Sequence, residues 1–281
     1  MVIDNHVLQS LKEKAAELRR NVIFSIGVGP TGHIGGSFSA ADLVAALYFH
    51  KMKHDPNDRY MVDRDRFVIS KGHVAILQYA ALAQSGYFPV EDLKNTKTID
   101  SALQGHPDLV KTGDLGIEAG TGSLGQGLSI GVGMALGLRM DKIPSNVYVL
   151  LGDGELAEGQ VWEAAMAGSI FGLDKLIAIV DKNSKQAQGT VAERFNIENI
   201  VGKWENFGWH VIEVDGHNME QILDALYSAD NAHGKPTVII ASTVKGKGLA
   251  IAEEHPAGLH NAALTQEQYD QAIKLFSGGA R

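Results

Sequence analysis

The sequence predicts an α/β protein, with a doubly wound, mostly parallel sheet flanked by helices. Short apolar runs rich in β-forming residues recur along the chain, and each is too short to be anything but a strand buried on both faces. Between them lie segments whose apolar residues recur at spacings of three and four, the periodicity of helices that pack on a sheet. The alternation runs through all 281 residues without a repeat or a convincing linker, so we expect one domain over residues 1–281.

Local capping signals set the expected ends of the elements. Gly27 is expected to end the first helix, and the pattern Ser39-Ala-Ala-Asp42 to begin the second. Asn218 and the capping box Thr265-Gln-Glu-Gln268 are expected to begin two later helices. In the first half of the chain we expect a helix over 5–26, a loop over 29–38, a helix over 39–49, a strand over 66–70, a helix over 74–85 and a helix from 125 to 137. In the second half we expect strands over 147–151 and 176–180 with a helix between them, a helix over 198–207, a strand over 209–214, a helix over 218–229, a strand over 236–242 and a last helix after 265.

The helix expected from Gly125 to Gly137 contains five glycines. In an exposed helix each would cost up to about 1 kcal/mol relative to alanine. We therefore expect a buried helix that another backbone approaches closely, either its own sheet or a partner subunit.

The segment from Gly152 to Asn183 combines a strand, a Gly-Asp-Gly turn, a helix and a second strand. A right-handed crossover places the two strand ends side by side, at the edge where open α/β sheets bind ligands. Asp153 and Asn183 supply oxygens there that suit a hard divalent cation. Gly154 lets the backbone approach a ligand, and the following helix is expected to point its free N–H groups the same way. A bare Gly-Asp-Gly is more often an ordinary turn, but the strands and helix around it favour a metal and diphosphate site.

These residues carry a resemblance to a known family. Gly-Asp-Gly followed by Asn183 resembles the thiamine-diphosphate motif, and the continuation Glu158-Gly-x-x-Trp-Glu163 resembles the transketolase branch. The resemblance implies that Mg²⁺ or Ca²⁺ binds Asp153, Asn183 and the main-chain carbonyl of Lys185, beside the diphosphate of thiamine diphosphate.

Four of the eleven histidines directly follow a glycine in an expected turn. An isolated histidine is most often structural, but several on loops around one sheet edge can hold oxygens and move protons. Three of them lie in loops similar to transketolase loops, which implies that His33 and His106 line the donor sugar channel and that His73 touches the diphosphate. The family's late histidine best matches His260, near both sugar and diphosphate. His217, in Val-Asp-Gly-His-Asn, is interpreted as part of a helix-capping turn.

The segment Gly120-Thr-Gly122-Ser123-Leu124-Gly125 has two interpretations. It matches the dinucleotide fingerprint formally, but no apolar strand precedes it. It also resembles the transketolase segment that lies against the cofactor, which implicates Gly122, Ser123 and Leu124. Glu158 resembles an acidic residue at the family's subunit interface near the cofactor, although an exposed residue in the first turn of a helix explains it equally well.

Composition limits the other classes of function. The net charge of −8 gives no nucleic-acid footprint and no basic membrane face. No apolar run approaches the length of a membrane span, and the first residues lack the features of a signal peptide. The absence of cysteine excludes disulfides and thiolate chemistry and fits a cytoplasmic protein.

The resemblance covers only the first part of the family's full-length architecture. The pyrimidine-binding and C-terminal domains are absent and are expected on a separate chain. The chain is thus similar to the N-terminal subunit of a split transketolase, a heterotetramer of two of each subunit that transfers a two-carbon ketol unit from a ketose phosphate to an aldose phosphate.

Three alternatives stay open at this point. The chain could serve a related thiamine-diphosphate enzyme of the 1-deoxyxylulose-phosphate synthase or dehydrogenase type. It could be a cofactor-binding scaffold without catalysis of its own. It could also be a nicotinamide-dependent oxidoreductase, which would bind its nucleotide without a divalent ion.

Overall fold

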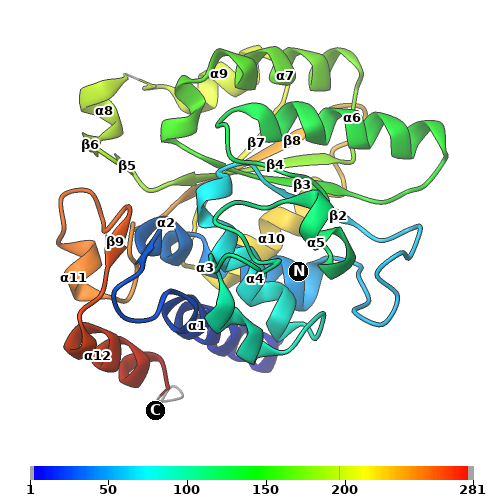
Figure 1. Ribbon diagram of the computed structural model, residues 1–281. Helices are drawn as coiled ribbons and strands as arrows, with labels where there is room; N and C mark the ends of the chain where they lie inside the picture. Colours follow the sequence, from blue (N-terminus) through cyan, green and yellow to red (C-terminus); the bar gives the residue numbers. More distant parts are fainter. Residues whose placement is uncertain (1–2, 196, 278–281) are drawn as a thin grey trace.

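The computed structural model describes residues 3–195 and 197–277 (Figure 1). Its centre is a five-stranded sheet with the order β2-β3-β4-β8-β7, in which every neighbouring pair is parallel. The strands are β2 (Arg66–Ile69), β3 (Val147–Gly152), β4 (Leu176–Lys182), β7 (His210–Asp215) and β8 (Thr237–Ser242). The predicted doubly wound parallel architecture is confirmed.

Helices cover both faces of this sheet, as Figure 1 shows. One face carries α6 (Gln126–Met140), α7 (Gly159–Ile170) and α9 (Ile200–Asn206). The other carries α1 (Asn5–Ile26), α3 (Ala41–Ala46), α4 (Ala75–Gln84) and α10 (Met219–Ala229). Within β3, Val149 belongs to the core under the first set of helices, whereas Tyr148 and Leu150 belong to the core under the second. Strands β3, β4 and β8 are buried on both faces, which is why their sequences are largely continuous apolar runs. The edge strand β7 is mostly half-buried or exposed.

The remaining α-helices and β-strands are shorter than five residues, except for α2 with six and the last helix, α12, with twelve. They are α2 (Ile34–Ser39), α5 (Leu109–Thr112), α8 (Val191–Arg194), α11 (Ala250–Glu253), α12 (Gln266–Ser277), the strand pair β1 (Thr31–Gly32) with β9 (Ala262–Ala263), and the hairpin of β5 (Lys185–Gln186) with β6 (Gly189–Thr190). Within the part of the chain that the structure describes, no helix combines the length and apolarity that crossing a membrane requires.

Several expected helix ends are confirmed. Gly27 follows α1 with a positive φ of 69°. The Asn218 side chain accepts from the backbone N–H groups of Glu220 and Gln221 at the start of α10. Thr265 and Gln268 form the reciprocal bonds of a capping box at the start of α12.

The region between α1 and β2 differs from the prediction. The expected loop contains α2, and Ser39 ends this helix rather than beginning the next one. The Ser39 hydroxyl donates to the buried carboxylate of Asp181 at 2.6 Å, so a long-range hydrogen bond has replaced the local cap. Helix α3 begins after Ala40 without a side-chain cap, and the chain continues past it as a π-helical segment (Leu47–Lys51).

The predicted helix between the two strands is present as α7, but it does not follow the Gly-Asp-Gly turn directly. A 3₁₀ segment (Gly154–Ala157) comes first, and α7 begins only at Gly159. The cause is Glu155, whose buried side chain turns inward and accepts from the backbone N–H of Gly152 at 3.0 Å. The N-terminus of α7 therefore does not follow the Gly-Asp-Gly turn directly.

The glycines of α6 fall into two groups. A Cβ on Gly127 would lie 2.4 Å from Ser70 Cβ, and one on Gly131 would lie 2.5 Å from Val149 Cγ2. These two positions let the helix approach its own sheet, as expected. Cβ atoms on Gly133 and Gly137 would meet nothing within 4 Å, so these positions face away from the chain.

Candidate active site

Two neighbouring strands bring the predicted metal ligands together. β3 and β4 pair in parallel with Gly152 opposite Asp181, so Asp153 and Asn183 leave the same edge of the sheet. Asp153 and Asn183 are buried, and together with Lys185 they line one cavity of about 170 Å³. The right-handed crossover through α7 fixes this adjacency, as the sequence predicted.

The Asp153 carboxylate is held by backbone donors. Oδ1 accepts from the N–H of Gly154 at 2.8 Å, and Oδ2 accepts from the N–H of Ser184 at 2.5 Å. Burial and the nearby charge of Asp181 raise the pKa of Asp153 to about 6. A cation beside this carboxylate would favour its ionised form, so the site is suited to bind one.

The other two oxygens are neutral. Asn183 Nδ2 donates to Asp181 at 2.9 Å, and Asn183 Oδ1 accepts from the N–H of Lys185 at 3.1 Å. The Lys185 carbonyl accepts from the Lys245 ammonium at 2.9 Å. Amide and carbonyl oxygens have two lone pairs each, so both can also bind a metal.

The described residues contain no group of three or more His, Cys, Asp or Glu side chains that could hold a metal by themselves. One carboxylate and two neutral oxygens leave one of the two positive charges of a divalent cation to be balanced by the ligand. That donor set fits a hard cation bound together with an anionic group such as a diphosphate.

A buried ion pair lies behind these ligands. Lys71, just after β2, pairs with Asp181 of β4, and the two side chains are 3% and 0% exposed. Asp181 also accepts from Ser39 and Thr243. Burial raises the pKa of Asp181, but Lys71 and these donors outweigh it and hold the pKa below the usual range of an aspartate. The ionised Asp181 in turn orients the Asn183 amide.

Three predicted histidines lie close together beside the cavity, and two of them, His73 and His260, line it. The ring centroids of His33 and His73 are 4.9 Å apart, those of His33 and His260 are 5.3 Å apart, and those of His73 and His260 are 5.1 Å apart. Burial and neighbouring cations or imidazoles lower the pKa of His33 to about 4, that of His73 to about 2 and that of His260 to about 4. All three are neutral near pH 7, so each can donate one hydrogen bond and accept another.

Lys245 adds a positive charge to the same cavity. Its ammonium contacts His260 Nδ1 at 3.1 Å in addition to the Lys185 carbonyl. Burial and the charge of Lys71 lower its pKa to about 8. Two buried lysines thus converge on one cavity, and they favour an anionic ligand there.

The Glu155 side chain hydrogen-bonds to the loop that precedes α6 and so links this loop to the Gly-Asp-Gly turn. Its Oε1 accepts from the N–H of Gly125 at 2.8 Å and from the Ser70 hydroxyl. Ser70 Oγ in turn accepts from the N–H of Gly127 at 3.1 Å. Burial raises the pKa of Glu155, and these donors oppose that shift. The loop that precedes α6 is therefore positioned from the end of β3.

The remaining predicted residues lie at three places. Leu124 and Gly154 line the same cavity as Asp153. Gly122 and Ser123 lie with the exposed His106 in an outer groove of about 740 Å³. Glu158 is exposed at the N-cap of α7 and does not line the cavity.

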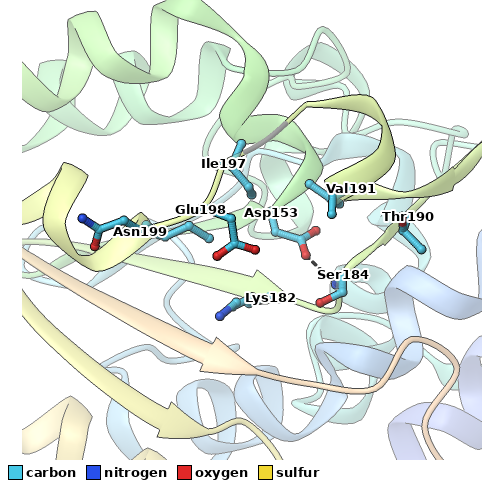
Figure 2. A pocket seen from close by; sticks show the side chains of 10 residues that line it. Asp153, Lys182, Ser184, Thr190, Val191, Ile197, Glu198 and Asn199 are labelled. Atoms are coloured by element: carbon cyan, nitrogen blue, oxygen red, sulfur yellow. Dashed lines mark hydrogen bonds between the residues drawn. The ribbon is translucent and has the colours of Figure 1, made fainter.

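Asp153 also lines a second cavity, of about 300 Å³, shown in Figure 2. Lys182, Thr190 and Glu198 line it as well, from β4, the β5–β6 hairpin and the segment before α9. Lys182 lines this second cavity and not the one that His73 and His260 line.

Four residues of the cavity with polar side chains were missed from sequence: Lys71, Glu155, Gln186 and Lys245. Lys71 and Glu155 adjoin predicted motifs, so their position was a usable signal. Lys245 lies in the Lys-Gly-Lys-Gly segment at the end of β8, the same sheet edge. The dinucleotide interpretation also fails here, because α5 and a 3₁₀ turn, and not a strand, precede Gly120.

A parallel α/β sheet that gathers a carboxylate, neutral oxygens, two lysines and three neutral histidines at its carboxyl edge defines a class of α/β domain suited to bind an anionic ligand such as a diphosphate there. Within that class the chain belongs to the transketolase family. Residues 12–277 match the family model described as the transketolase thiamine diphosphate binding domain.

Relatives of two lengths support this assignment. The chain is 44% identical to the 6-deoxy-6-sulfo-D-fructose transketolase subunit SqwG of Clostridium sp. (strain MSTE9), and the match covers 94% of each chain. It is 39% identical to an apulose-4-phosphate transketolase subunit of Phocaeicola vulgatus, with 96% of this chain and 95% of the relative covered. The transketolase structure from Campylobacter jejuni gives a TM-score of 0.86 at 32% identity, over 98% of this chain but 43% of that one. The chain therefore matches the full length of these subunits and about two fifths of one-chain transketolases.

Proposed function

We propose that this chain is the thiamine-diphosphate-binding, N-terminal subunit of a two-subunit transketolase. The observation that carries the proposal is the convergence of Asp153, Asn183 and the Lys185 carbonyl on one cavity that His73 and Lys245 also line. The named transketolase subunits support the proposal too, because the chain matches 94% and 95% of their lengths.

The protein groups would divide the work of binding. Asp153, Asn183 and the Lys185 carbonyl would hold Mg²⁺ or Ca²⁺, and the metal would neutralise the diphosphate. His73 and Lys245 would donate to diphosphate oxygens, and Gly154 and Leu124 would lie against the cofactor. Gly122 and Ser123 would do the same from the outer groove. When bound, thiamine diphosphate supplies the nucleophilic carbon that accepts a two-carbon ketol unit from a ketose and passes it to an aldose.

The histidines would act on the sugar. His33 and His260 are neutral near pH 7 because their pKa values are lowered to about 4, so they can hold hydroxyl groups and pass protons without adding charge. His106 would extend this row toward solvent, where the outer groove begins. The three would orient the donor sugar and move protons at its oxygen atoms.

The proposed function also implies the classes of substrate. We propose a ketose phosphate as donor and an aldose phosphate as acceptor. The relatives named for 6-deoxy-6-sulfo-D-fructose and for apulose-4-phosphate extend the donors worth testing to sulfonated and branched sugars.

A partner surface is available on α6 and α7. These helices pack together and leave Met140, Met166, Ile170 and Phe171 exposed, by 80%, 51%, 81% and 47%. Several large apolar side chains exposed on two neighbouring helices are typical of a protein interface. We propose that the complementary C-terminal subunit covers it, in a heterotetramer with two copies of each subunit, and that Glu158 lies near this interface.

The first experiment is calorimetric titration of the chain with thiamine diphosphate and Mg²⁺, alone and with the candidate second subunit. We expect metal-dependent binding that tightens with the partner and disappears in Asp153→Ala. Asp174→Ala is the matched control, because Asp174 precedes β4 at the opposite edge of the sheet. Absence of binding in the folded wild-type complex would refute the proposed function. Two-carbon transfer between sugar phosphates then separates transketolase from a synthase, a dehydrogenase or a scaffold.

A further inference from the structure

The Val-Asp-Gly-His-Asn motif has no part in the site described so far, yet the ring of its histidine joins two distant segments. His217 Nδ1 lies 2.8 Å from Asp42 Oδ2, and its Nε2 accepts from the backbone N–H of Val244 at 2.8 Å. Because Nε2 accepts from an amide, the ring proton lies on Nδ1 and is donated to Asp42. The ring therefore fixes the Val244 amide to a carboxylate of α3.

That carboxylate is itself rigidly held. Arg19 of α1 donates to Asp42 Oδ2 at 2.6 Å and to the Phe38 carbonyl at 3.0 Å. The Arg19 and Asp42 side chains are 8% and 11% exposed. Burial raises the pKa of Asp42, but Arg19 and His217 outweigh it, so the net shift is downward and the carboxylate is ionised. The ionised Asp42 carboxylate accepts from both Arg19 and His217, and such charge-assisted hydrogen bonds hold the imidazole in place.

The segment that His217 holds carries a residue of the cofactor site. Val244 precedes Lys245, whose ammonium reaches the Lys185 carbonyl at 2.9 Å. Backbone bonds from Thr243 to the Lys182 carbonyl at 3.0 Å and from Gly246 to the Gly35 carbonyl at 3.1 Å hold the segment on either side. Between these two backbone bonds, the N–H of Val244 donates to the His217 ring.

The turn after β7 places the His217 ring beside Val244. Gly216 donates to the Ser242 carbonyl at 2.8 Å, and a Cβ on Gly216 would lie 2.4 Å from Thr243 Cγ2. Glycine thus allows the turn after β7 to lie directly against the end of β8. The turn and the α10 cap are closed by Asp215 and Asn218, which bond backbone groups and leave the imidazole out.

We propose that His217 is a positioning residue of the cofactor site, which fixes the Val244 amide so that the Lys245 ammonium is held at the diphosphate. This role rests on the proposed function, in which Lys245 donates to the diphosphate. It deepens that function by assigning to an unexplained motif a part in cofactor affinity rather than in helix capping alone.

Two substitutions separate the bonds of the ring. In His217→Asn the side-chain amide lies near the position of Nδ1, so it can donate to Asp42 but does not reach Val244. In His217→Gln the amide oxygen reaches the position of Nε2 and can accept from Val244. Both variants keep the backbone bonds of the turn, and circular dichroism and thermal unfolding of each verify the fold.

The first measurement is amide hydrogen exchange at Val244 in the full chain. We expect exchange about tenfold faster in His217→Asn than in the wild type, and close to the wild-type rate in His217→Gln. The second is titration of thiamine diphosphate with Mg²⁺ into the complex with the second subunit. Loss of one positioning hydrogen bond corresponds to about three- to tenfold weaker binding in His217→Asn, with affinity restored in His217→Gln.

The outcomes separate the two claims. Suppose that the wild type binds thiamine diphosphate and that the two variants bind it with equal affinity, whether as tightly as the wild type or more weakly. Either result would overturn the positioning role of His217 and leave the proposed function intact. A wild-type complex that binds no thiamine diphosphate would overturn the proposed function and this role with it. Faster exchange at Val244 without a change in affinity would show that His217 acts on the fold alone, which also overturns the role.

Discussion

Replacing Lys71 with methionine tests how the site is built. The change removes the charge that faces Asp181 and keeps most of the side-chain volume. The two side chains are 3% and 0% exposed, so Asp181 would be left as a buried carboxylate without its cation. Removing one partner of a buried pair costs about 3–5 kcal/mol. Ser39, Thr243 and Asn183 still donate to Asp181, which places our expectation at the lower end, about 3 kcal/mol of unfolding free energy.

In Lys71→Met the pH dependence of the contribution of Asp181 to the unfolding free energy should change sign. In the wild type the pKa of Asp181 lies below the usual range of an aspartate, because Lys71 and the hydroxyl donors outweigh burial. That stabilisation is complete above the unfolded pKa and is lost as the pH falls through the folded pKa. In Lys71→Met burial acts without the lysine, so the folded pKa rises above the unfolded one. Stability is then greatest at low pH and falls as the pH rises, so the deficit against the wild type should be larger at about pH 8 than at about pH 5.

Urea unfolding of the cofactor-free chain, followed by circular dichroism at both pH values, measures this effect. Lys182→Met is the matched control, because Lys182 is close in sequence to Asp181 but lines the second cavity. We expect the control to change the unfolding free energy by no more than about 0.5 kcal/mol. A loss below about 1 kcal/mol in Lys71→Met, or an equal loss at both pH values, would refute the reasoning.

Further substitutions test the cofactor site and the glycine-rich helix. His73→Ala should weaken thiamine diphosphate binding in a calorimetric titration of the complex, and unchanged affinity would count against its contact with the diphosphate. His33→Ala should mainly slow turnover of the assembled enzyme in a ketol-transfer assay, and an unchanged rate would remove it from the sugar channel. Gly127→Ala should lower the thermal stability of the chain, because the new Cβ would lie 2.4 Å from Ser70 Cβ. Gly133→Ala should stabilise the isolated chain by up to about 1 kcal/mol, because its Cβ meets nothing, and should weaken assembly with the partner by sedimentation analysis. Unimpaired assembly would contradict a close helix approach at Gly133.

Much of the fold could be predicted from the sequence, because the relevant forces are local or depend on pattern. Strands buried on both faces must be continuous apolar runs, so β3, β4 and β8 were evident as such. Capping by Asn218 and by Thr265 involves neighbours in the chain and was predicted correctly. The adjacency of Asp153 and Asn183 followed from one rule of handedness for parallel strands.

Other features depend on contacts between residues far apart in the chain. Ser39 has the local sequence of a helix cap, but its hydroxyl bonds Asp181, 142 residues away. Lys71 and Asp181 are 110 residues apart, and nothing near either residue indicates the pair. A buried carboxylate is stable only when hydrogen-bond donors surround it, and those donors come from elements that are neighbours in the fold rather than in the sequence.

The sequence by itself determined the parallel sheet, the helix ends with strong caps, and the sheet edge at which a metal and a diphosphate could bind. Only the tertiary structure decided which side chains reach that edge. It brought His33, His73 and His260 to within 5.3 Å of one another by ring centroid, and it placed Lys245 beside the Lys185 carbonyl. It also turned Glu155 inward, which replaced the expected helix start by a 3₁₀ turn. The physical reason is that local pattern fixes where the backbone must be buried, whereas buried polar groups find their partners only after the strands have come together.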